Sequence, residues 1–239
     1  MKICFIHAMT GSTPADLAFE KKLLASYASP GKEIEIWEIA QGAESIESYF
    51  DISLGAVELF RLVKQAEQGG ADGVVITCFG NANMDPAREI ATIPVIGSGL
   101  ASISLAATLC RRFSIIGTLP AVRGRFEAEV WKAGLLDKLA SIRTINMGVM
   151  ELDAASDAMK RAMIEEARRA VHEDKAEAIV PGCFGMIGVA AQIQQALGVP
   201  VIEPAGAAVC LMETLVKLHL SQSKLAYPFP PDKKRSFGF

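Results

Sequence analysis

Short apolar runs rich in β-branched residues alternate along the chain with longer stretches of helical periodicity. The apolar runs predict strands at residues 3–7, 33–39, 73–77, 94–96, 113–117, 142–146, 178–180 and 200–202. The stretches between them predict helices ending near residue 27, at 53–68, ending near 111, at 122–133, at 155–172 and ending near 220. Because this alternation is typical of parallel sheets covered by helices, we expect an α/β fold.

The second half of the chain repeats the first. The segment Gly-Val-Val-Ile-Thr-Cys-Phe-Gly at residues 73–80 returns 105 residues later as Ala-Ile-Val-Pro-Gly-Cys-Phe-Gly at residues 178–185. Ile-Pro-Val-Ile at residues 93–96 returns 106 residues later as Val-Pro-Val-Ile at residues 199–202. Internal repeats indicate related structural units. We therefore expect two Rossmann-like lobes, whose equivalent loops would lie on opposite walls of one cleft.

Each repeat places a cysteine, Cys78 or Cys183, between a buried strand and the helix expected after it. Ligands of open α/β sheets bind at the carboxyl ends of strands, and the positive end of a helix dipole favours a thiolate there. The backbone N–H groups of Gly80 and Gly185 can approach an anionic oxygen closely because glycine has no side chain. We interpret the remaining cysteines as small apolar side chains: Cys4, Cys110 and Cys210.

Two acidic groups facing each other across a cleft suit one reaction class in particular. One group removes a proton from one face of a carbon, and the other returns a proton to the opposite face. Repulsion between two nearby thiolates favours a pair with one thiolate and one thiol. Loop N–H groups would stabilise the enolate-like charge on the substrate. The pattern therefore predicts proton transfer that requires neither a metal nor an organic cofactor.

The two cysteine loops belong to a set of motifs spread along the chain. They are Cys78-Phe79-Gly80-Asn81, Arg88-Glu89-Ile90, Pro94-Val95-Ile96-Gly97, Phe113-Ser114-Ile115-Ile116-Gly117-Thr118, Gly182-Cys183-Phe184-Gly185-Met186 and the ending Ser223-Lys224, Tyr227 and Pro228. Through these motifs nearly the whole chain resembles the aspartate/glutamate/hydantoin racemase superfamily, and its hydantoin racemase branch in particular.

The resemblance implies an isomerase with two lobes related by a pseudo-twofold axis and an active site in the cleft between them. Cys78 and Cys183 would be the two bases, each serving one enantiomer. The residues implied to line the substrate site are Thr10, Phe79, Gly80, Asn81, Thr118, Phe184 and Gly185. Because one lobe interrupts the other in this superfamily, we expect a first lobe at residues 1–98, completed by a returning helix at 207–222. The second lobe would span residues 99–206, followed by a tail at 223–239.

The chain departs from the hydantoin racemase pattern at three places. His7-Ala8-Met9-Thr10 stands where Asn-Pro-Asn-Thr is usual, and Asn81 and Gly188 each replace a usual aspartate. These departures leave the substrate open. The leading hypothesis is a 5-substituted hydantoin, because Cys-Phe-Gly in both loops favours a ring-shaped substrate of low charge. The alternatives are aspartate or glutamate, allantoin, or ligand binding without turnover.

His7 ends the first predicted strand, at the position of a cleft residue. Its imidazole could polarise a carbonyl or position a thiol, and it could equally be a hydrogen-bonded histidine near the surface. Gly97-Ser98-Gly99 opens a helix but matches a dinucleotide-binding fingerprint incompletely. We interpret this glycine pair as a packing feature.

Composition narrows the choice of partners and compartment. The 24 basic and 27 acidic residues give a net charge of −3, which favours neither nucleic acid nor an anionic membrane as a partner. The uncharged stretches at residues 91–110 and 178–202 contain prolines and glycines, as buried loops do and membrane spans do not. Five widely spaced cysteines and no signal-peptide pattern in residues 1–20 suit the cytoplasm. The resemblance adds a small-molecule substrate and a homo-oligomer.

Overall fold

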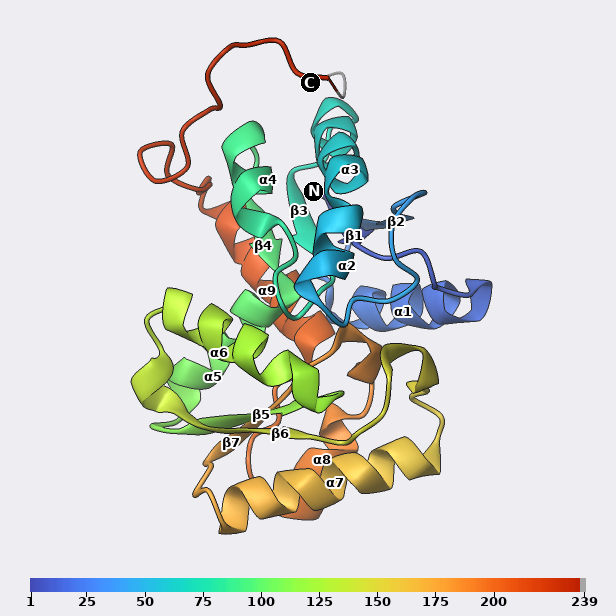
Figure 1. Cartoon of the computed structure of the whole chain (residues 1–239), viewed down its shortest axis with the longest axis vertical. Coiled ribbons are helices and arrows are strands. Elements are labelled where there is room, and N and C mark those ends of the chain that lie inside the picture. Colours follow the sequence, from blue (N-terminus) through green and yellow to red (C-terminus); the bar gives the residue numbers. More distant parts are fainter. Residues whose placement is uncertain (237–239) are drawn as a thin grey trace.

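The computed structural model describes residues 1–236 and contains two parallel β-sheets, one above the other in Figure 1. The first sheet has the strand order β2-β1-β3-β4, with β1 (Lys2–His7), β2 (Glu33–Glu38), β3 (Gly73–Ile76) and β4 (Val95–Gly97). The second has the order β6-β5-β7, with β5 (Phe113–Gly117), β6 (Leu139–Thr144) and β7 (Ala178–Pro181). The predicted α/β class is therefore confirmed.

Nine α-helices surround these sheets within the described residues. Those that follow strands of the first sheet are α1 (Pro14–Tyr27), α2 (Tyr49–Leu54), α3 (Ala56–Gln68), α4 (Met84–Ile90) and α5 (Ser98–Leu109). The others are α6 (Arg123–Lys132), α7 (Asp157–His172), α8 (Ala190–Leu197) and α9 (Pro204–Lys217). Apolar residues at helical spacing explain the buried faces: Leu59, Val63 and Ala66 of α3 pack under the first sheet, and Met159, Met163 and Ala167 of α7 under the second.

The sequence repeat appears as equivalent backbone hydrogen bonds in the two sheets. In the first sheet, the N–H of Val74 donates to Pro94 O at 2.9 Å; in the second, the N–H of Ile179 donates to Pro200 O at 2.9 Å. Thr77 N–H likewise donates to the neighbouring strand at Ile6 O, as Gly182 N–H does at Ile116 O. The two sheets therefore share one topology, in which β1, β2 and β3 correspond to β5, β6 and β7.

The structure corrects several predicted boundaries. The helix predicted at 53–68 is two helices, because Ser48 and Asp51 cap an earlier start at Tyr49 and Gly55 separates α2 from α3. The strand predicted at 142–146 is β6, which ends at Thr144 because Asn146 has a left-handed backbone with φ 56°. The strand predicted at 200–202 is reduced to one bridge between Ile179 and Val201. The prediction omitted the short helices α4 and α8.

Helix α9 returns to the first sheet after the chain has completed the second (Figure 1). It contacts α1, β3, β4 and, most extensively, α5. Residues 221–224 continue along the first sheet's edge: Gln222 bonds to Ala91 O, Ile93 O and Val95 N, and the Lys224 ammonium donates to Arg88 O. The tail expected at 223–239 is therefore partly packed, and its residues 237–239 lie outside the described part. The division into lobes at 98 and 206 stays a prediction.

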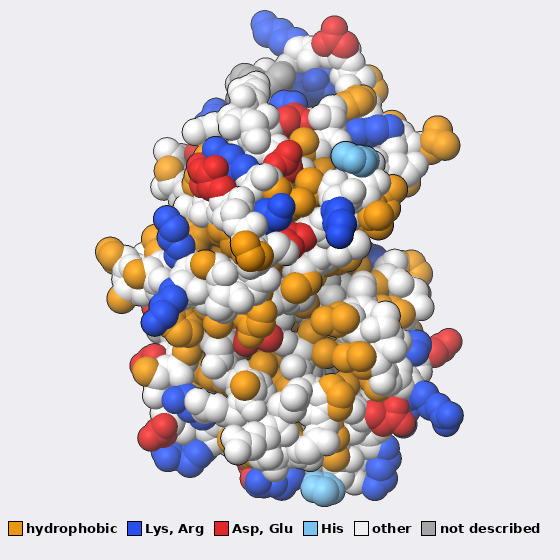
Figure 2. All heavy atoms as spheres, turned by 180° about the vertical axis from the view of Figure 1, so that it is seen from behind, with side chains coloured by type: hydrophobic (Ala, Val, Ile, Leu, Met, Phe, Trp, Pro, Cys, Tyr) orange, Lys and Arg blue, Asp and Glu red, His pale blue; other side chains and the backbone are white. Residues whose placement is uncertain are grey.

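Apolar side chains gather in the middle band of the face shown in Figure 2, around the junction of the two halves of the molecule. Within the described residues, no helix is long and apolar enough to cross a membrane. Of the three cysteines interpreted as apolar filler, Cys4 is buried and Cys110 half-buried, but Cys210 is exposed on α9. The expected homo-oligomer stays a prediction.

Candidate active site

A cavity of about 500 Å³ lies where the carboxyl ends of both sheets meet. Its wall comes from the loops that follow β1, β3, β5 and β7, from α1 and α6, and from residues 149–155. Apolar side chains such as Met9, Phe19, Ile46, Phe126 and Met150 make up much of the wall. A cavity of this size and lining is typical of a small-molecule site.

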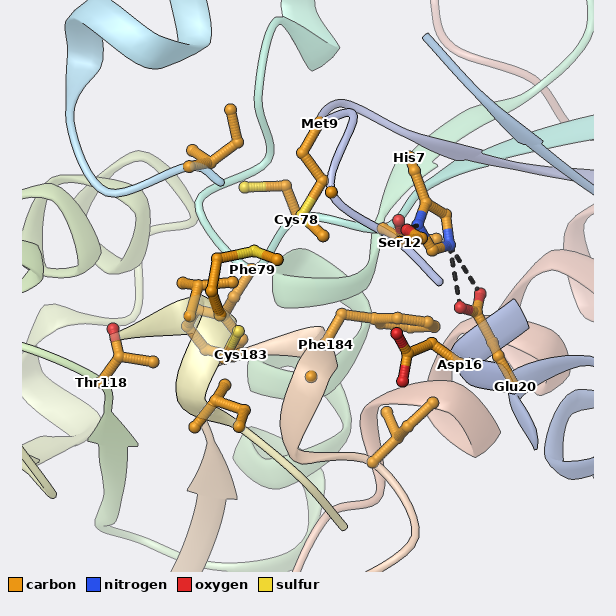
Figure 3. A pocket seen from close by; sticks show the side chains of 18 of the residues that line it. His7, Met9, Ser12, Asp16, Glu20, Cys78, Phe79, Thr118, Cys183 and Phe184 are labelled. Carbon is orange, nitrogen blue, oxygen red and sulfur yellow. Dashed lines mark hydrogen bonds and ion pairs between the residues drawn. The ribbon is translucent and has the colours of Figure 1, made fainter. Parts of the chain in front are cut away.

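Cys78 and Cys183 enter this cavity from loops of different sheets (Figure 3). Each follows a buried strand and opens a tight turn of the same design. Asn81 N–H donates to Cys78 O at 2.9 Å, and Met186 N–H donates to Cys183 O at 3.0 Å. The two Cys-Phe-Gly copies therefore adopt equivalent turns, and both half-buried cysteines reach one cavity.

Burial raises the pKa of both thiols, and that of Cys183 reaches about 12. The Arg125 charge and backbone N–H groups act in the opposite direction, and a charge on Cys78 would raise the pKa of Cys183 further. The expectation that a helix dipole favours both thiolates is wrong. Cys78 precedes a turn, with α4 beginning only at Met84, and Cys183 precedes a single 3₁₀ turn. From these directions we expect both cysteines to be thiols in the ligand-free protein at neutral pH.

Five of the seven residues expected beside the cysteines line the cavity: Phe79, Gly80, Thr118, Phe184 and Gly185. Thr10 and Asn81 do not. Thr10 is held by its N–H and hydroxyl, which both donate to Ala43 O.

Asn81 joins the Cys78 turn to two helices. Its side-chain N–H donates to Glu129 of α6 at 2.8 Å, and its carbonyl accepts from the Leu100 N–H of α5 at 3.0 Å. An aspartate would place a second carboxylate against Glu129, which explains why an amide stands here. The glycine pair serves the same packing: a Cβ on Gly97 would lie 2.0 Å from Asn81 Oδ1, and one on Gly99 would lie 1.8 Å from Phe79 O.

We expect Asn81→Asp to lower the free energy of unfolding at pH 7 by about 1–3 kcal/mol, because the buried Glu129 carboxylate loses a donor and gains a like charge. Urea denaturation measures the loss. Lowering the pH toward 5 should recover part of it, since a protonated carboxyl can donate again. Adding Glu129→Gln to the same variant restores a donor and should also recover stability. An unchanged urea midpoint in the single variant would contradict this account.

His7 is held on both sides of its ring. Nδ1 lies 2.9 Å from the Ser12 hydroxyl, and Nε2 lies 2.8 Å from Oε2 of Glu20, a buried carboxylate of α1 (Figure 3). The ring meets Phe184 of the second sheet's loop edge to face, with centroids 6.4 Å apart. His7 therefore lines the cavity as a buried, hydrogen-bonded side chain beside Phe184, and the expectation that it could lie near the surface is wrong. Its action on a substrate carbonyl or a thiol stays a prediction.

Sequence reasoning missed Arg125 at the cavity and two carboxylates behind its wall, those of Glu129 and Glu47. Arg125 and Glu129 are buried one helical turn apart on α6, beside the apolar positions Phe126 and Val130. Charged residues at such spacing next to an apolar stripe were the available signal. No feature of the sequence pointed to Glu47. Its carboxylate accepts from the Val149 N–H at 2.8 Å, and this bond connects the two halves of the molecule beside the cavity.

Comparison with known proteins agrees with this geometry. The family model described as Asp/Glu/Hydantoin racemase matches residues 17–212. A hydantoin racemase from Pseudomonas sp. (strain NS671) is 38% identical over 197 residues, covering 82% of this chain and 79% of that protein. One from Rhizobium meliloti is 33% identical over 229 residues, 94% of each chain. The solved structure of allantoin racemase from Klebsiella pneumoniae matches with a TM-score of 0.92 and 33% identity, covering 99% of this chain and 96% of that one. This chain thus belongs to the Asp/Glu/hydantoin racemase family, as its paired cysteine loops led us to expect.

Proposed function

We propose that this chain interconverts the enantiomers of 5-substituted hydantoins by proton transfer between Cys78, the substrate carbon and Cys183. The observation that supports the proposal most is the pair of equivalent cysteine turns, carried by different sheets and open to one cavity. A carbon held between two such groups has one acid–base group on each face. The curated relatives named hydantoin racemase support the choice of substrate.

In the proposed reaction one cysteine is a thiolate and the other a thiol. The thiolate takes the proton from C5 of the ring, and the electrons of the C–H bond move into the adjacent carbonyl to give an enolate. The second thiol then delivers its proton to the opposite face of C5, and the enolate electrons return to form the new C–H bond. The enzyme ends with the protonation of its two sulfurs exchanged, ready for the opposite enantiomer. No metal or organic cofactor takes part in this scheme.

Allantoin is the second candidate substrate, because the allantoin racemase match extends over nearly the full length of both chains. Allantoin is itself a hydantoin with a polar ureido group at C5, so the same two-thiol chemistry applies. The apolar side chains Met9, Phe19 and Met150 at the cavity favour an apolar substituent over the ureido group.

A substrate panel in heavy water tests the proposal. We expect both enantiomers of 5-benzylhydantoin to invert and to incorporate deuterium at C5, with allantoin slower and with aspartate and glutamate unreactive. Chiral chromatography and mass spectrometry measure the two processes, after subtraction of the rate without enzyme. The double variant Cys78→Ser/Cys183→Ser is the matched control and should show neither process. Faster inversion of aspartate or glutamate than of 5-benzylhydantoin would overturn the proposed substrate class.

A further inference from the structure

Arg125 of α6 is a buried cation whose hydrogen-bonding capacity is largely unused. The residue is 6% exposed and lines the cavity. Its Nη2 donates to Ile46 O at 3.4 Å, whereas Nε and Nη1 are buried without a hydrogen-bond partner. Among residues 1–236 no carboxylate lies within ion-pair distance of it, although its charge lowers the pKa of the Asp51 carboxyl from farther away. Its guanidinium carbon lies 5.7 Å from the centre of the Phe126 ring.

A guanidinium remains charged at any accessible pH, so burying it without an anion is costly. A protein that retains such a group in a ligand cavity gains from it when a negative charge enters. Among the described residues, the other buried side-chain atoms without a hydrogen-bond partner are Glu35 Oε2 and Ser98 Oγ, and neither residue lines the cavity. The unused donors at the cavity wall are therefore concentrated on Arg125.

The position of Arg125 brings its positive charge near the carbon that reacts in the proposed function. A Cβ built on Gly80 would lie 3.2 Å from Arg125 Nε. Because Gly80 has no side chain, the guanidinium has room beside the Cys78 turn. The charge of Arg125 also acts on both sulfurs, lowering the pKa of each against the larger effect of burial. A carbon held between the two sulfurs is consequently within the field of this one cation.

The loop N–H groups expected to hold the enolate oxygen also act on the two sulfurs. The N–H groups of Gly80 and Ala82 lower the pKa of Cys78, and the N–H of Gly185 lowers the pKa of Cys183. These groups therefore favour the thiolate form of each cysteine. During proton abstraction the negative charge moves from a sulfur to an oxygen of the substrate, and there the cation of Arg125 at the cavity wall can bind it.

We propose that Arg125 binds a negatively charged oxygen of the substrate in this cavity, an inference that rests on the proposed racemase function. Two oxygens have the required chemistry. One is the ring oxygen next to C5, which becomes negative as the proton leaves. The other is a carboxylate on the C5 substituent, which is negative throughout. Either oxygen would accept hydrogen bonds from the unused Nε–H and Nη1–H donors of Arg125.

Arg125→Met and Arg125→Lys test the proposal, with Arg123→Met as the matched control. Arg123 is exposed on the same helix, two residues earlier. We expect Arg125→Met to lower kcat about 10²–10³-fold, the range for removal of one oxyanion donor, with partial recovery in Arg125→Lys. Arg123→Met should behave as the parent. The thermal midpoint of ligand-free Arg125→Met should equal or exceed that of the parent, because the substitution removes an unpaired buried charge. A structural role would instead lower that midpoint.

Two substrates separate the two oxygens: 5-benzylhydantoin and 5-carboxymethylhydantoin. Equal losses in kcat/KM on both identify the ring oxygen, and a loss confined to the carboxymethyl compound identifies the substituent. Parent-like kcat and KM on both substrates, or a thermal midpoint that falls in step with activity, would overturn the role of Arg125 while leaving the racemase in place. Failure of the parent enzyme to exchange or invert either compound would instead overturn the proposed function itself.

Discussion

Replacing either Cys78 or Cys183 by serine should abolish racemisation in both directions, with a loss of about 10³-fold or more in kcat. Net inversion requires one group on each face of the carbon, and the two cysteine turns belong to different sheets. A serine hydroxyl does not ionise near neutral pH, so it cannot replace a thiolate as the base. The side chain remains similar in size, and the cavity should keep its shape.

The two single variants should nevertheless differ in heavy water. The remaining thiolate can still remove the proton of the enantiomer that presents C–H to it and return deuterium to the same face. Cys78→Ser and Cys183→Ser should therefore each exchange one enantiomer, and the two enantiomers should be opposite. Cys210→Ser, on the exposed face of α9, is the control and should behave as the parent. Exchange of the same enantiomer by both variants, or parent-like racemisation by either, would refute the two-thiol mechanism.

Racemisation should accelerate about tenfold per pH unit between about pH 7 and pH 9. Burial raises the pKa of the Cys78 thiol and brings that of Cys183 to about 12, so both are thiols at neutral pH. The active form has one thiolate, and the population of that form grows with pH until the lower pKa of the pair is reached. A second ionisation at still higher pH would remove the proton donor and lower the rate again.

Measurement of kcat/KM against pH checks this expectation, because that ratio follows the ionisation of the free enzyme. The rate without enzyme must be subtracted at each pH, since hydantoins exchange spontaneously in base. The ultraviolet absorbance of the thiolate gives an independent readout, in which the difference between the parent and Cys78→Ser or Cys183→Ser isolates the ionisation of the replaced cysteine. A rate that is constant between pH 7 and pH 9 would show that a thiolate is already formed at neutral pH.

Most of the predictions about the fold and the two cysteine loops came from the repeat in the sequence. Nearly equal spacing of Cys78 and Cys183 from the Pro94 and Pro200 segments indicated two related units, and the same backbone hydrogen bonds appear in both. Local patterns of this kind determine strands, turns and their order, since they depend on neighbouring residues. They were less informative where a cap or a glycine decides a boundary, as at Ser48 and Gly55.

The contacts that define the cavity wall join residues far apart in sequence. Asn81 meets Glu129 across 48 residues, and Glu47 meets Val149 across 102 residues. Whether a polar side chain faces the cavity or a neighbouring helix depends on the packing of those elements. For this reason the sequence did not indicate that the Asn81 side chain bonds to Glu129 or that Arg125 lines the cavity.

Because α9 returns to the first sheet, the packing of that sheet cannot be completed until the end of synthesis, although its strands are synthesised first. One face of that sheet presents Ile3, Phe5 and Val75, which join an apolar cluster with Val209 and Met212 of α9. A ribosome releases the amino-terminal strands first, yet this cover emerges only after the whole second sheet has been made. The sheet made first is thus completed last. We therefore expect a nascent or truncated chain that stops before Pro204 to expose more of these β-branched and aromatic side chains, and to aggregate more readily than the full chain.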